Sequence, residues 1–169
     1  RDYKVTGVQT CALPISHYVG DAVQPLHTTK HYNGWIGANP NDYATNKTFH
    51  QWVDGGFLKK AGIDAELITG KLRSASDLAA ATPSLRTNLF SSATKLVVEQ
   101  FQQVEPLYVL NKTGKLTLRN AGAAEGREFL HRQMSIGAQY LADLWVTAWK
   151  NAPPDNFLRS QLAQRNAKE

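Results

Sequence analysis

The chain has 169 residues, of which 42% are hydrophobic, 20% charged and 9% aromatic, so its composition excludes a collagen-like or a wholly disordered protein. Charged and polar residues interrupt every hydrophobic stretch before it reaches the roughly 18–20 residues that cross a bilayer, so we predict no integral membrane segment. The formal net charge of +5 suits an anionic substrate but is weaker than the clustered charge of a dedicated nucleic-acid binder.

The first sixteen residues, RDYKVTGVQTCALPIS, have neither a helical nor a strand period. Within them, the stretch from Val5 to Ile15 resembles the in-frame translation of a common sequencing-library adapter; the alternative is a natural arm with the same residues. We therefore expect residues 1–16 to be an adapter-derived artefact and residues 17–169 to be the C-terminal part of a single domain. Cys11 is the only cysteine, so this natural part offers no thiolate for a disulfide or a metal site.

The next part of the chain predicts a helix end, a loop and a helix. Residues 17–24 are read as the end of a helix, because Pro25 disfavours helical geometry at Gln24. Residues 28–46 are crowded with Asn, Gly, Pro and Thr, which predicts a long surface loop. Residues 48–61 carry apolar side chains three to five positions apart, so a helix is predicted there despite Gly55 and Gly56.

The second half predicts two long amphipathic helices, over about 84–110 and 118–150, joined by a short turn centred on Gly114. They are expected to pack as an antiparallel hairpin, and two prolines at 153 and 154 stop the second helix. The polar tail is compatible with a last helix that frays. With no convincing strand pattern, the predicted fold class is all-α. The residues of the second helix that are expected to face the core are Phe129, Leu130, Met134, Gly137, Tyr140, Leu141, Leu144, Trp145, Ala148 and Trp149.

Five candidate metal ligands lie in the first third of the chain. His17 and Asp21 are four residues apart, a spacing that puts the imidazole and the carboxylate on one face of a helix. His27 follows the helix break and can turn back toward the same place. His50 and Asp54 repeat the four-residue spacing on the next predicted helix. Nitrogen and carboxylate donors without a thiolate suit zinc in an open, water-bearing site.

One H-x-x-x-D unit alone is more often a surface ion pair or a capped histidine than a metal site. Two such units and a third histidine within one short region weigh against that explanation. The residue pattern alone nevertheless leaves both explanations open, a surface ion pair or capped histidine and a metal site.

Other residues near these units have competing interpretations. His31 is read as a solvent-exposed loop histidine rather than a ligand, and Trp52 as a core residue. His131 lies in a charged stretch of the second long helix, so it is expected to be solvated rather than to bind metal. Three aromatic loop residues either stack on a nucleic-acid base or pack the loop itself: Tyr32, Trp35 and Tyr43.

The string HYVGDAVQPLH, followed 23 positions after His27 by the second H-x-x-x-D unit, resembles the metal-binding core of the single-strand-specific zinc nucleases of fungi, plants and bacteria. That family shares its helical fold with bacterial zinc-dependent phospholipase C. The resemblance covers residues 17–54 as a motif and the rest only as long helices. It implies a multi-helix bundle, incomplete here at its N-terminus, with three zinc ions. His17 would bind one metal of a close pair, Asp21 would bridge that pair as the catalytic residue, and the third zinc would be held by His27, His50 and Asp54.

The resemblance further implies a zinc-dependent phosphodiesterase that hydrolyses phosphate esters with metal-activated water. The expected enzyme is an endonuclease for single-stranded DNA or RNA that can also act as a 3′-nucleotidase on nucleotides. Its remaining family ligands, an N-terminal Trp with a nearby His and a later Asp and His, have no matching positions here. We therefore expect this chain to hold only the third zinc well and to be weakly active or inactive.

The loop after His27, TTKHYNGWIGANPNDY, departs from the Gly-Gly-Asn pattern of the eukaryotic nucleases and indicates a bacterial branch, which leaves the substrate open. One alternative is a phospholipase C that acts on a phospholipid head group, and another is a non-catalytic helical protein with a vestigial zinc site. By resemblance the protein is expected to be monomeric and periplasmic or secreted.

Overall fold

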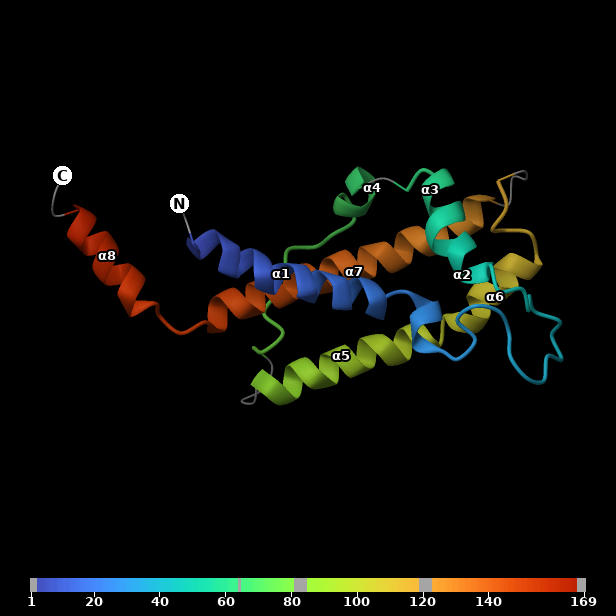
Figure 1. Ribbon diagram of the computed structural model, residues 1–169, viewed down its shortest axis with the longest axis horizontal. Coiled ribbons are helices and arrows are strands. Elements are labelled where there is room, and N and C mark those ends of the chain that lie inside the picture. Colours follow the sequence, from blue (N-terminus) through green and yellow to red (C-terminus); the bar gives the residue numbers. More distant parts are fainter. Residues whose placement is uncertain (1–2, 64, 81–84, 119–122, 167–169) are drawn as a thin grey trace.

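The computed structural model describes residues 3–63, 65–80, 85–118 and 123–166, and within these ranges it is all-α, as predicted (Figure 1). The described residues form no β-strand, only an isolated bridge between Tyr32 and Gly34. The helical elements in chain order are α1 (Tyr3–Ala22), η1 (Pro25–Thr28), α2 (Phe49–Gln51), η2 (Trp52–Phe57), α3 (Leu58–Lys60), α4 (Ala65–Thr69), α5 (Leu85–Phe101), α6 (Val104–Lys112), α7 (Ala123–Asn151) and α8 (Asn156–Asn166).

Helix α1 ends where the sequence predicts. Gln24 adopts an extended conformation, and its side-chain Oε1 accepts a hydrogen bond of 3.1 Å from the N–H of Leu26, which caps the 3-10 helix η1. Pro25 occupies the first turn of η1, where its missing N–H costs nothing. Residues 3–16, which show no helical period, belong to the same helix as residues 17–22. Their proposed adapter origin stays a prediction.

The loop between η1 and α2 is held by one buried tyrosine of α6. The Tyr108 hydroxyl donates to the carbonyl of His31 at 2.5 Å and accepts from the N–H of Gly34 at 3.1 Å. Gly34 has φ +107°, and a Cβ there would lie 2.7 Å from the carbonyl oxygen of Thr45, so this close crossing of the loop requires glycine. The predicted long loop is therefore confirmed, and it is tied to the core at its base.

Two of the three aromatic residues of this loop, Trp35 and Tyr43, pack on each other, whereas Tyr32 is 52% exposed. The ring of Trp35 lies 4.9 Å from Tyr43 and 5.3 Å from Tyr108, so for Trp35 and Tyr43 the structure favours loop packing. Burial raises the pKa of Tyr43, and so does its hydrogen bond to Glu105. His31 is half-buried rather than solvent-exposed, because its ring stacks on Trp35 at 4.0 Å. Burial, followed by the charge of Lys30, lowers the pKa of His31.

The single helix predicted over residues 84–110 is wrong, because the chain breaks at Gln102 and Gln103 into α5 and α6. On the predicted stripe, Phe101 is 56% exposed, whereas Val104 and Tyr108 of α6 are buried. The break thus rotates α6 so that its apolar face meets the core. That core lies around α2, η2, α6 and the start of α7, and it contains Leu26, Tyr43, Phe49, Val53, Phe57, Ala61, Val104, Leu107, Tyr108, Leu116, Ala123, Phe129 and Leu130. Trp52 packs against it, as predicted.

Helix α7 runs antiparallel to α5 and α6, as predicted, but of these two helices it packs mainly on α6, whereas α5 packs on η1 and α1 (Figure 1). This helix was expected to start at about Leu118, which lies in a turn; residues 119–122 lie outside the described residues, and α7 begins at Ala123. Figure 1 also shows α1 along α7. A Cβ on Gly137 would lie 2.8 Å from Cγ2 of Val23, so the glycine permits this close approach.

The predicted inward face of α7 is correct at Phe129, Leu130 and Gly137. It is only half-buried at Tyr140, Leu141 and Leu144, and the other four predicted residues are exposed. Trp145 is 49% and Trp149 85% exposed, and Met134 and Ala148 are exposed as well. The second half of α7 instead buries polar side chains, because the segment after α4 lies on it and bonds to them. The Arg73 guanidinium meets Asp143 at 2.5 Å, and the N–H of Leu78 donates to Oγ1 of Thr147 at 2.8 Å.

His131 belongs to the same polar face, so its predicted solvation is wrong. It is buried, with Nδ1 3.3 Å from Nζ of Lys71. Helix α8, the predicted last helix, projects away from the other helices in Figure 1. Among the described residues, no helix has the length and apolar character needed to cross a membrane.

Candidate metal centre

Three of the predicted ligands come together where η1 faces the α2–η2 segment. His27 lies in η1, three residues after the capping Gln24, so its side chain leaves the direction of α1 and turns toward the second unit. His50 lies in α2, and Asp54 lies in the π-helix η2. The ligand atoms of these three residues all lie within 4.8 Å of one another.

The wider turn of η2 is stabilised by a tryptophan and a glycine. Trp52 donates through Nε1 to the carbonyl of Leu116 at 2.8 Å, and its ring covers Gly56. A Cβ on Gly56 would lie 2.3 Å from Cε3 of Trp52, whereas a Cβ on Gly55 would meet nothing within 4 Å. Gly56, which weakens the helix prediction made from the sequence, is therefore the residue that leaves room for the ring of Trp52. Single π-turns of this kind often occur at functional sites.

The distances fit one zinc ion held by three side chains. Nε2 of His27 lies 3.0 Å from Nε2 of His50, and Oδ2 of Asp54 lies 2.7 Å from His50 Nε2 and 3.9 Å from His27 Nε2. A tetrahedral zinc with bonds of about 2.0–2.1 Å separates two ligand atoms by about 3.3 Å, which these distances bracket. Two imidazoles and one carboxylate are also a donor set that leaves a fourth position for water or substrate.

Asp21 fixes the orientation of His27 from the other side of the ring. Its Oδ1 lies 3.1 Å from Nδ1 of His27, and its Oδ2 lies 3.2 Å from Nε2 of His17. A proton on Nδ1 of His27 directs the lone pair of Nε2 toward His50 and Asp54, which is the arrangement in which a carboxylate orients a metal-ligating histidine. All five predicted residues thus form one chain of contacts, with Asp21 and His17 beside the three-residue cluster.

Sequence reasoning missed Gln24. Its Nε2 donates a short hydrogen bond to Oδ1 of Asp54, while its Oε1 caps η1. The side chain thereby ties η1 to η2 and leaves Oδ2 of Asp54 directed at the two histidines. Asn33 acts similarly through the backbone, since its Oδ1 accepts from the N–H of His50 at 3.2 Å. Neither residue stands in a spacing that marks a ligand, so no sequence signal pointed to them.

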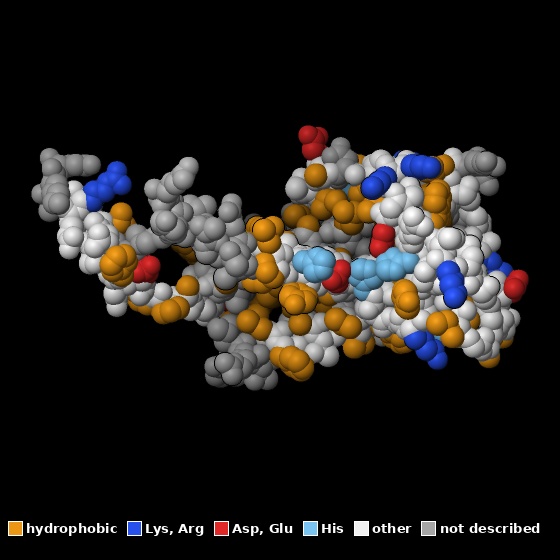
Figure 2. All heavy atoms as spheres, in the orientation of Figure 1, with side chains coloured by type: hydrophobic (Ala, Val, Ile, Leu, Met, Phe, Trp, Pro, Cys, Tyr) orange, Lys and Arg blue, Asp and Glu red, His pale blue; other side chains and the backbone are white. Residues whose placement is uncertain are grey.

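The centre opens to solvent on one face of the molecule. The side chains are 32% exposed at His27, 24% at His50 and 41% at Asp54. Figure 2 shows histidine and acidic side chains gathered next to one another on this face. A water or an anionic group can therefore reach the cluster, as a catalytic rather than a purely structural metal requires.

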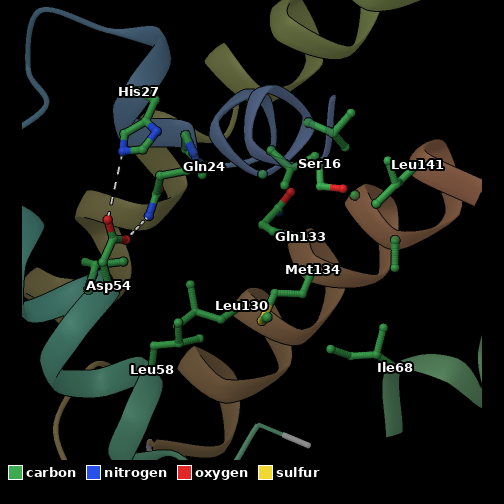
Figure 3. A pocket seen from close by; sticks show the side chains of 17 residues that line it. Ser16, Gln24, His27, Asp54, Leu58, Ile68, Leu130, Gln133, Met134 and Leu141 are labelled. Atoms are coloured by element: carbon green, nitrogen blue, oxygen red, sulfur yellow. Dashed lines mark hydrogen bonds and ion pairs between the residues drawn. The ribbon is translucent and has the colours of Figure 1, made fainter. Parts of the chain in front are cut away.

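Behind the cluster lies a cavity of about 380 Å³ between α1, η2 and α7, and Figure 3 shows His27, Gln24 and Asp54 at one end of it.

A scan against protein-family models, a search of curated proteins and a search of solved structures each found no match to this chain. Arguments about its function therefore depend on the site itself.

Proposed function

We propose that the chain belongs to a zinc-dependent phosphodiesterase, a hydrolase acting on phosphate esters, with single-stranded nucleic acid or nucleotides as its substrates. The observation that carries the proposal is the convergence of His27, His50 and Asp54 from two separate helical elements onto a space that fits one tetrahedral ion. Surface ion pairs do not require three donors to meet, and no thiolate or lysine enters the group. When bound, zinc lowers the pKa of a water molecule toward about 7 and stabilises charge on the oxygens of an in-line displacement.

The residues of this chain have separate parts in that chemistry. His27, His50 and Asp54 hold the ion, while Asp21 keeps the proton on Nδ1 of His27 and so keeps Nε2 free to bind. Gln24 restrains the carboxylate of Asp54. In the three-zinc arrangement that the sequence resemblance implies, His17 and Asp21 also contribute to the close metal pair. The exposed side of the cluster admits the phosphate, whose negative charge is favoured by a net positive chain.

Zinc titration of the purified chain tests the proposal. We expect the wild-type chain to bind zinc, the variant His50→Ala to lose that binding, and the matched histidine variant His31→Ala to keep it, since His31 lies outside the cluster. Zinc-dependent cleavage of single-stranded DNA, weak in this chain, is expected to follow the same order. Failure of the wild-type chain to bind zinc, or equal zinc binding by the wild-type and His50→Ala chains, contradicts the proposal.

A phospholipase C is the second candidate, and the apolar lining of the cavity beside the cluster is the observation that favours it. It predicts zinc-dependent cleavage of phosphatidylcholine and no cleavage of single-stranded DNA. The two substrates, given to the same zinc-loaded chain, separate the two candidates.

A further inference from the structure

The cavity behind the metal centre contains one polar group that the structure does not pair. Apolar side chains of α1, η2 and α7 form most of its wall, among them Val19, Val53 and Leu130. Gln133 of α7 lines the same cavity and is only 4% exposed. Figure 3 shows its side chain rising from α7 toward α1, with the metal-centre residues His27 and Asp54 at one end of the cavity.

The amide of Gln133 has no hydrogen-bond partner among the described residues, at either Oε1 or Nε2. The other polar side chains around it are already engaged: Ser16 donates to the carbonyl of Ala12 at 2.8 Å, and Gln24 bonds to Asp54 and Leu26. A buried carboxamide that lacks both partners is costly, and a leucine or methionine would fill the same space without that cost. The amide is therefore suited to a molecule that enters the cavity.

We propose that this cavity binds a nucleobase and that Gln133 is the residue that recognises its edge. The inference rests on the proposed phosphodiesterase function and names the part of the substrate that the cavity takes. A carboxamide presents an acceptor and a donor side by side, which is the pattern that pairs with adenine through two hydrogen bonds. The apolar wall suits the faces of the base, and the phosphate would extend toward His27 and Asp54.

The unpaired amide of Gln133 favours a base over a lipid chain in this cavity. The cavity volume of about 380 Å³ lies in the range of small-molecule sites. An acyl chain would fill the apolar volume but leave both atoms of the Gln133 amide unpaired. A site built to hydrogen-bond its ligand discriminates strongly against an analogue that lacks the matching groups, because the polar groups of the site are then left unsatisfied. Gln133 is thus a specificity-determining residue that favours a nucleotide over a phospholipid.

The test measures binding of adenosine, which has no phosphate, to the full chain in the presence of EDTA by isothermal titration calorimetry. We expect saturable binding by the wild-type chain and a loss of about tenfold or more in affinity for Gln133→Leu, which keeps the bulk but removes both hydrogen bonds. The matched control is Gln161→Leu on the exposed face of α8, which is expected to bind like the wild type. Ala138→Phe, which fills the cavity from its wall, is expected to abolish binding and serves as a second variant should Gln133→Leu fail to fold.

The outcomes separate this inference from the proposed function. Equal adenosine affinity of the wild-type and Gln133→Leu chains overturns it, as does the absence of adenosine binding. Binding of short-chain phosphatidylcholine that strengthens in Gln133→Leu also overturns it and supports the lipid alternative. Zinc binding is measured separately and is expected to be unchanged in Gln133→Leu. Loss of zinc binding in the wild-type chain would defeat the phosphodiesterase proposal while the adenosine measurement, made in EDTA, would still stand.

Discussion

The contact between Asp21 and His27 orients one imidazole of the candidate metal centre. Because Oδ1 of Asp21 lies 3.1 Å from Nδ1 of His27, we predict that Asp21→Ala lowers the affinity for zinc by about 10–100-fold, the usual effect of removing such a partner. His17→Ala is the comparison, since His17 contacts Asp21 but is 76% exposed and outside the three-residue cluster. Competition titration with a chelating dye measures both variants. A smaller loss for Asp21→Ala than for His17→Ala would contradict the positioning role.

The second residue-scale prediction concerns Asp143 and pH. Burial would raise the pKa of Asp143, but hydrogen bonds from Arg73, the N–H of Ser76 and Gln139 outweigh it and hold the pKa below its ordinary value. A lowered folded-state pKa stabilises the protein above the unfolded value of about 3.9, and that stabilisation is lost as the pH falls through the folded-state pKa. Asp143→Asn is therefore expected to lower the free energy of unfolding by about 1–3 kcal/mol at pH 7.

The pH dependence itself is the decisive part of this measurement. Urea unfolding at a series of pH values should show the gap between wild type and Asp143→Asn narrowing below about pH 4, because the carboxylate is protonated in the unfolded chain before it is protonated in the folded one. Glu99→Gln alters an exposed i,i+4 pair with Lys95 and should change stability by less than about 0.5 kcal/mol at any pH. A gap that is constant from pH 7 to pH 3 would mean that the charge of Asp143 is not what stabilises the fold.

At the scale of the element, the π-helix η2 depends on Gly56. Gly56→Ala would place a Cβ 2.3 Å from the Trp52 ring, and that ring is held by its hydrogen bond to Leu116. We predict a loss of about 1–3 kcal/mol in the free energy of unfolding, typical of overpacking, together with weaker zinc binding, because Asp54 lies on the same turn. Gly55→Ala is the matched control, since its Cβ would meet nothing within 4 Å. Thermal unfolding and zinc titration of the pair give both readouts, and equal effects of the two substitutions would exclude this role of Trp52.

The same element marks a limit of sequence interpretation. The apolar spacing over residues 48–61 correctly predicts helical structure, but a π-turn has no separate spacing signal, so the glycines read only as weak helix formers. The break between α5 and α6 has a similar cause. The apolar stripe continues through Phe101 and Val104, and only the three-dimensional core decides that one is exposed and the other buried. Periodicity therefore predicts that helices form, whereas packing against distant segments sets where they break.

For the whole molecule, the sequence predicts the all-α class, the antiparallel course of α7 relative to α5 and α6, and the residues of the three-residue cluster, because each follows from local spacing. The predicted burial pattern is wrong for α7 beyond its first turns, where Trp145 is exposed and His131 and Asp143 are buried. The polar segment that covers this face has no periodic pattern, and its hydrogen bonds to Asp143 join residues about seventy positions apart. The unpaired amide of Gln133 is likewise visible only once the cavity around it is formed.

Zinc bound at His27 and His50 would join η1 to α2 across the long loop, so the ion should stabilise the whole fold. Binding to the folded state alone adds about 2.7 kcal/mol at a zinc concentration of 100 times Kd. For a chain of this size, that corresponds to a rise in Tm of about 5–10 °C. Differential scanning calorimetry with zinc and then with EDTA should show the rise and its reversal in the wild-type chain and neither in His50→Ala. An equal rise in both proteins would show that zinc stabilises the molecule somewhere other than at this centre.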